Sequence, residues 1–71
     1  MKKTYSIGYT DKYDDFRKVW DNLGYTKKFE TIEEAENYIQ QKIAPEYINI
    51  NKPIKIMQGW KVIKEIFYKE A

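Results

Sequence analysis

The large number of aromatic rings is the feature that most constrains this chain. Its 71 residues include seven Tyr, three Phe and two Trp, but a single leucine, Leu23. A chain of this length forms one domain, residues 1–71, and buries only about 60% of the surface that it exposes when unfolded. Because such a small core has few leucines to draw on here, we expect large rings to supply much of its packing.

The residue types that are absent limit the chemistry. The chain has no cysteine and no histidine, and Ser6 is its only serine. The usual nucleophiles, near-neutral acid–base groups and zinc ligands are therefore missing. Asp11, Asp14 and Asp15 lie close together but lack the glycine-centred loop of a calcium site. We expect a protein that is not an enzyme and that binds no cofactor and no metal.

No segment of the sequence predicts export or insertion into a membrane. Residues 4–9 are too polar and too few for a signal-peptide core, and no run approaches about 20 apolar residues. The absence of disulfides in such a small chain also favours a reducing compartment. We therefore expect a cytoplasmic protein without membrane contact.

The first third of the chain predicts a strand followed by a helix. Tyr5, Ile7 and Tyr9 alternate with small residues, as in a half-buried strand over residues 4–10. Thr10 and Asp11 then offer a helix N-cap. Apolar residues follow at spacings close to those of one helical face, and a glycine ends the run: Tyr13, Phe16, Val19, Trp20, Leu23 and Gly24.

A hairpin is the alternative for this region. Residues 16–20 and 25–29 are rich in β-formers and flank the turn-like segment 21–24. We favour the helix over residues 13–23, because Phe16, Val19 and Leu23 share one face of a helix but split across both faces of a strand. Residues 25–30 predict a short strand.

A second helix is predicted to start after Thr31. The Thr31 hydroxyl can accept a hydrogen bond from the Glu34 amide while the Glu34 carboxylate accepts one from the Thr31 amide, as in a capping box. Pro45 cannot continue a helix, so this one ends near Ile43. Its apolar stripe consists of Ile32, Ala35, Ile39 and Ile43, with Tyr38 beside it.

The last third predicts two strands. Ile54 and Ile56 alternate with Lys55, and Gln58–Gly59 predicts a tight turn into residues 60–68. This last run is apolar on both faces, so it is either central in the sheet or pressed against something outside the chain; a helix is the alternative for it. The predicted fold is α+β, in the order β-α-β-α-β-β, with two helices packed on one face of a small antiparallel or mixed sheet.

One functional hypothesis is nucleic-acid binding, which the distribution of charge raises. Residues 11–36 carry eight acidic and five basic side chains, whereas residues 37–71 carry six lysines and three glutamates. In the basic half, lysines that can pair with phosphates lie near rings that can stack on bases: Lys55, Lys61, Lys64, Trp60, Tyr47 and Tyr68. Arg17 is the only arginine, however, and arginine is the usual reader of base edges. A small nucleic-acid-binding or regulatory domain is therefore the alternative function.

The leading hypothesis is a protein-binding module. Twelve rings exceed what the core of a ~70-residue chain needs, and tyrosine is common in recognition surfaces. A homodimer formed through an edge strand is another arrangement that such a chain permits. The predicted partner-binding set combines the surplus rings with the lysines of the C-terminal half: Tyr9, Tyr25, Tyr47, Lys55, Trp60, Lys61, Lys64, Phe67 and Tyr68.

One segment carries a resemblance. Residues 29–39, FETIEEAENYI, are similar to a strand-to-capped-helix step in small Lys/Glu/Tyr/Ile-rich α+β proteins of phages and mobile elements of low-GC bacteria. The resemblance covers 11 of the 71 residues. It implies a host-directed protein that acts by binding, and anti-CRISPR inhibitors of bacterial immunity are the prominent type. The partner would then be a larger bacterial defence protein or nucleoprotein complex in the host cytoplasm.

Overall fold

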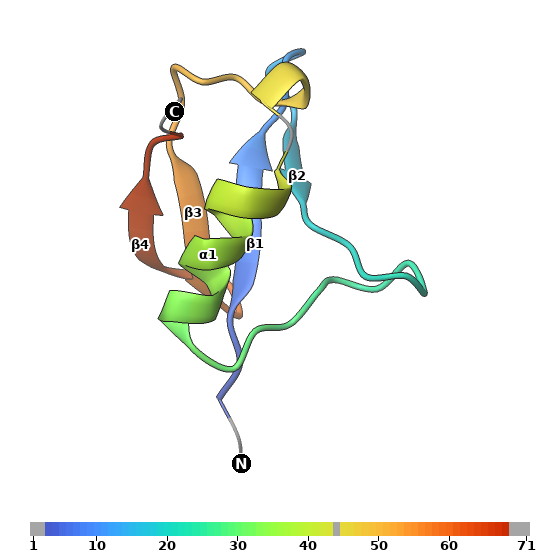
Figure 1. Ribbon diagram of the computed structural model, residues 1–71, viewed down its shortest axis with the longest axis vertical. Coiled ribbons are helices and arrows are strands. Elements are labelled where there is room, and N and C mark those ends of the chain that lie inside the picture. Colours follow the sequence, from blue (N-terminus) through green and yellow to red (C-terminus); the bar gives the residue numbers. More distant parts are fainter. Residues whose placement is uncertain (1–2, 44, 69–71) are drawn as a thin grey trace.

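A four-stranded antiparallel sheet carries one helix on one of its faces (Figure 1). The computed structural model describes residues 3–43 and 45–68. Strand order in the sheet is β2-β1-β3-β4, and each neighbouring pair is antiparallel. In chain order the elements are β1 (Ser6–Thr10), β2 (Phe16–Lys18), α1 (Ile32–Lys42), the 3-10 helix η1 (Pro45–Tyr47), β3 (Ile54–Gln58) and β4 (Lys61–Ile66).

The prediction of two helices packed on a sheet is wrong. Within the described residues there is one α-helix, and the fold is mostly sheet. Residues 13–23 do not form a helix but contain β2 and a turn, as in the hairpin alternative. Residues 25–30 do not form a full strand either, since only Thr26 and Phe29 make isolated bridges, to Trp20 and Tyr5.

The carboxylate of Asp11 explains why no helix starts there. It accepts hydrogen bonds from the backbone amides of Tyr13 (2.8 Å) and Asp15 (2.9 Å) and from Arg17 Nε (2.5 Å). These bonds fold residues 11–15 into the turn that joins β1 to β2, in which Asp14 adopts a positive φ of 68°. An aspartate that can cap a helix thus stabilises a turn instead, because its side chain competes equally well for loop amides.

Asp21 repeats this arrangement at the next reversal of the chain. Its Oδ1 accepts from the amides of Leu23 (2.8 Å) and Tyr25 (3.0 Å), again two and four residues ahead. Gly24 supplies the positive φ of 86° that this turn requires. The turn projects away from the sheet and carries Leu23, which is exposed (Figure 1). The other apolar residues that had suggested a helical face lie before this turn, and all of them except Val19 are exposed as well: Tyr13, Phe16 and Trp20.

The core is built from isoleucines rather than rings. Ile7, Ile39, Ile54 and Ile56 are the largest fully buried side chains, and they bring α1, β1 and β3 together. Among the described residues Phe29 is the one aromatic residue that is buried, whereas Tyr5, Tyr9, Tyr38 and Tyr68 are partly buried and pack against the core. Rings thus contribute to the packing, as expected, but at the margin of the core and not at its centre. Most of the other rings lie at the margin of the core or in solvent, because a single helix cannot cover more than the middle of the sheet.

Strand β4 lies at the edge of the sheet, so of the two positions predicted from its apolar faces the central one is wrong. Its register against β3 shifts between Ile56 and Met57, which is a β-bulge. Gly59, with φ of 62°, turns the chain between β3 and β4 where Gln58–Gly59 predicted a turn. Lysines and a bulge are devices that discourage an edge strand from pairing with another sheet, and β4 has both.

Helix α1 begins as predicted, with one change in its cap. The Thr31 hydroxyl accepts from the Glu34 amide at 3.0 Å. The Glu34 carboxylate, however, accepts from the amide of Glu30 at 3.2 Å and not from that of Thr31. Ala35 and Ile39 are the buried residues of α1, and Ile32 and Tyr38 pack against the core while partly exposed.

Replacing Thr31 with alanine tests the contribution of this cap. T31A is expected to lower the free energy of unfolding by about 1 kcal/mol, because the Glu34 amide loses its acceptor. Urea denaturation followed by far-ultraviolet circular dichroism measures the change. T31S keeps the hydroxyl and serves as the control, so an equal loss in both variants would contradict the assignment.

Candidate functional site

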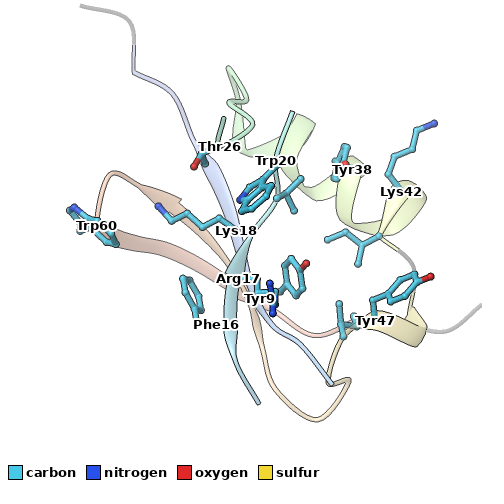
Figure 2. Close-up of a pocket in the computed structure, with 13 residues that line it drawn as sticks. Tyr9, Phe16, Arg17, Lys18, Trp20, Thr26, Tyr38, Lys42, Tyr47 and Trp60 are labelled. Atoms are coloured by element: carbon cyan, nitrogen blue, oxygen red, sulfur yellow. The ribbon is translucent and has the colours of Figure 1, made fainter. Parts of the chain in front are cut away.

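A surface hollow of about 810 Å³ surrounds the edge strand β2. Figure 2 shows that β2 runs through its middle and presents side chains to both sides. Register explains this split: Lys18 pairs with Gly8 and Phe16 with Thr10 on one face of the sheet, whereas Arg17 pairs with Tyr9 on the other. The hollow therefore consists of two surfaces, one on each side of the strand.

The surface on the helix side is a groove between α1, β2 and η1. Its floor is formed by the buried side chains of Val19 and Ile48. We call it the tyrosine groove, after the residues that line its walls: Tyr9, Arg17, Tyr38, Lys42, Ile43 and Tyr47. It exists because α1 covers the central strands and leaves the flank of β2 uncovered (Figures 1 and 2).

Positive charge dominates the hollow. Arg17, Lys18 and Lys42 are among its thirteen lining residues, and none of the lining residues is an aspartate or glutamate. Lys12 adds a cation at one end, where its Nζ lies 5.9 Å from the ring centroid of Tyr47. Such a site favours a partner that presents negative charge.

Asp11 orients the arginine of this groove. The hydrogen bond from Arg17, together with those from the Asp15 and Tyr13 amides, lowers the pKa of Asp11, and the same contact raises the pKa of Arg17. The Asp11 side chain is only 7% exposed, whereas that of Arg17 is 56% exposed. The guanidinium of Arg17 is thus accessible to a partner, while the buried carboxylate of Asp11 fixes its position.

The surface on the other side of β2 is flatter and carries exposed rings. No helix covers this side of the sheet within the described residues (Figure 1). The side chains of Trp20 and Lys18 point to this side in Figure 2, toward Trp60. We call it the open sheet face, and it comprises Phe16, Lys18, Trp20, Lys55 and Trp60.

Gly8 shapes the centre of this face. A Cβ placed on Gly8 would lie 2.4 Å from Cζ of Phe16 and 3.3 Å from Sδ of Met57. The Phe16 ring therefore lies directly against the backbone of β1, where any other residue would displace it. Glycine at this position is explained by the close approach of a ring.

The residues predicted to bind a partner do not form one surface. Tyr9 and Tyr47 belong to the tyrosine groove, and Trp60 and Lys55 to the open sheet face. Tyr25 is 70% exposed but lies on the turn after Asp21, outside the hollow.

The predicted cluster of lysines is divided as well. Lys55 pairs with Glu65 on the open sheet face, but Lys64 pairs with Ile56 on the helix side, where its Nζ contacts the carboxylate of Glu36. Lys61 is exposed at the start of β4. Phe67 is exposed beyond the end of β4, whereas Tyr68 is partly buried against the core.

Several residues of the hollow were absent from the predicted set. Phe16 and Trp20 had been assigned to the apolar face of a helix, so they counted as core. The hairpin alternative contained the signal that finds them, because alternation along a strand puts Phe16, Lys18 and Trp20 on one face. The other lining residues that the prediction missed are Arg17, Lys18, Val19, Thr26, Tyr38, Lys42, Ile43 and Ile48.

Comparisons with family models, curated proteins and solved structures found no match for this chain. Across the described residues, no three or more carboxylate, cysteine or histidine side chains are grouped so that they could hold a metal ion. In the same residues, no helix has the length and apolar character needed to cross a membrane.

Replacing Gly8 with alanine tests the contact with Phe16. G8A is expected to lower the free energy of unfolding by about 1–2 kcal/mol, because the ring must leave the sheet. In an F16A background the new methyl group meets no ring, so the same substitution should cost much less. Urea unfolding of the four proteins in a double-mutant cycle measures the coupling, and additive effects would show that the ring does not lie on Gly8.

The lowered pKa of Asp11 predicts a dependence of stability on pH. A carboxyl whose pKa is depressed by folding stabilises the protein above the unfolded value, about 3.9, and this contribution is lost as the pH falls through the folded value. D11N retains a side-chain oxygen for the turn amides but has no charge. From about pH 5 downward, the unfolding free energy of the native protein should fall more steeply than that of D11N. E33Q, on the exposed side of α1, is the control and should follow the native curve.

Proposed function

We propose that this chain is a non-enzymatic protein-binding module whose tyrosine groove receives a segment of a larger partner protein. The observation that carries the proposal is an apolar floor of buried Val19 and Ile48 beneath three tyrosine rings. Tyrosine offers a large rigid contact area and a hydroxyl at low entropic cost, which suits a protein interface.

The charges around the groove indicate the chemistry of the partner segment. Arg17 and Lys42 flank the apolar floor, and no carboxylate lines it. A segment that inserts an apolar side chain between carboxylates would fill the floor and pair with both cations. We therefore infer an acidic segment with an apolar anchor.

Recognition through side chains is favoured over strand pairing. Strand β2 has only three residues, and β4 carries a bulge and exposed lysines. Both features weaken an edge as a template for another strand. A homodimer formed by edge pairing is therefore less well supported than a groove that takes a partner.

The biological setting follows from the resemblance of residues 29–39 to small phage-encoded proteins. On that basis the partner is a bacterial protein, with defence proteins the foremost class, and docking blocks its site in the host cytoplasm. The groove supports the binding step of this proposal, and the resemblance supports the inhibitory step.

The groove is tested by a double substitution, Y47A with K42E. Both side chains are largely exposed, so the variant should fold, and it should lose at least tenfold in affinity because a ring and a cation are removed. A bacterial protein captured by the tagged native chain is purified, and its affinity for each variant is measured by calorimetry. Y25A removes an equally exposed tyrosine outside the hollow and should bind as the native chain does. Equal affinity for the double variant would contradict the proposal.

A further inference from the structure

The open sheet face is a second surface that the proposed docking of a protein in the tyrosine groove does not use. Trp60 is 87% exposed, Trp20 66% and Phe16 50%. Burial of large rings is favourable, so leaving three of them on one uncovered face costs solubility without adding to the core. Rings gathered in this way mark a contact surface.

Two lysines of this face each lie close to an aromatic ring. Lys18 Nζ lies 4.7 Å from the ring centroid of Trp60. Lys55 Nζ lies 6.0 Å from the ring centroid of Phe16. The two pairs come from opposite edges of the central strand β1, because Lys18 and Lys55 are both register partners of Gly8. Because Gly8 has no side chain, the Phe16 ring lies against its backbone, between the two lysines.

We propose that the open sheet face binds single-stranded nucleic acid. Bases would stack on Trp60 and Phe16, with Trp20 extending the platform, and backbone phosphates would pair with Lys18 and Lys55. An antiparallel sheet face with exposed rings suits unpaired bases, whose flat faces are accessible, whereas a duplex hides them in its stack. The face thus offers rings for bases and lysines for phosphates in close proximity.

The charges on this face support that occupant over a second copy of the chain. Register places one carboxylate of the four strands here, Glu65, which pairs with Lys55. Two copies meeting through this face would bring Lys18 and Lys55 of each against those of the other, and such like-charge contacts are unfavourable. A polyanion with flat, stackable groups satisfies both the lysines and the rings.

The test uses the full chain and a fluorescein-labelled oligothymidylate of about twelve nucleotides, long enough to cross the face. Fluorescence anisotropy is measured at salt concentrations between about 50 and 200 mM. Binding is expected to weaken with salt with a logarithmic slope of about −1.4, which corresponds to two phosphate contacts on a single strand. A duplex of the same length should bind at least tenfold more weakly.

Two variants separate stacking from charge. W60A removes a ring that is almost fully exposed and should weaken binding about tenfold without changing the salt slope. K18Q should lower the slope by about 0.7, because one phosphate contact is lost. Y25A is the control for an exposed ring elsewhere and should bind as the native chain does.

Several outcomes would overturn the inference. No binding at the lowest salt, or equal binding of single strand and duplex with W60A unaffected, would refute it. Polyglutamate that binds as tightly as the oligonucleotide and depends equally on Trp60 would instead identify an acidic protein as the occupant. Concentration-dependent dimers in sedimentation that W60A abolishes would identify a second copy. The Y47A/K42E variant should keep its affinity for the oligonucleotide, so failure of the groove and failure of this face can be told apart.

Discussion

The three hydrogen bonds that Asp11 accepts determine the arrangement of the first half of the molecule. They turn the chain back so that β2 lies along β1, and they hold Arg17 beside Tyr9. Without this turn, residues 13–23 have the spacing to fold as a helix and to bury their apolar side chains. Because the turn forms, Phe16 and Trp20 lie in and just after the edge strand β2, with their side chains exposed. Both candidate binding surfaces depend on that one carboxylate.

The parts of the fold that the sequence predicts correctly are those encoded locally. The cap at Thr31, the apolar stripe through Ala35 and Ile39, and the alternation around Ile56 act within a few residues, and each reappears in the structure. The region after Asp11 is different because an aspartate followed by apolar residues suits either a helix cap or a turn. Tertiary pairing with β1 decides between them, and a single sequence does not contain that information.

The candidate site illustrates the same limit. An excess of rings predicts that some are exposed but not which ones, since burial depends on how much of the sheet the helices cover. Within the described residues only one α-helix forms, and the narrow layer beneath it is filled mainly by isoleucines, with Phe29 as the one buried ring. Lys55 and Lys64 appear as one cluster in the sequence, yet they lie on opposite faces, because Lys55 pairs with Glu65 and side chains alternate along β4. The face of the sheet on which a side chain lies depends on the pairing register of its strand, and a single sequence does not specify that register.

The turn from Asp21 to Tyr25 is not constrained by packing in the way that the sheet is. A side chain at Gly24 would meet no atom within 4 Å, and Leu23 is 80% exposed. Gly8, by contrast, leaves no space for even a methyl group. Natural variation should therefore accumulate at this turn while β1 stays nearly constant. Related chains could differ there in length and composition, and so gain contacts with new partners, without disturbing the fold that presents them.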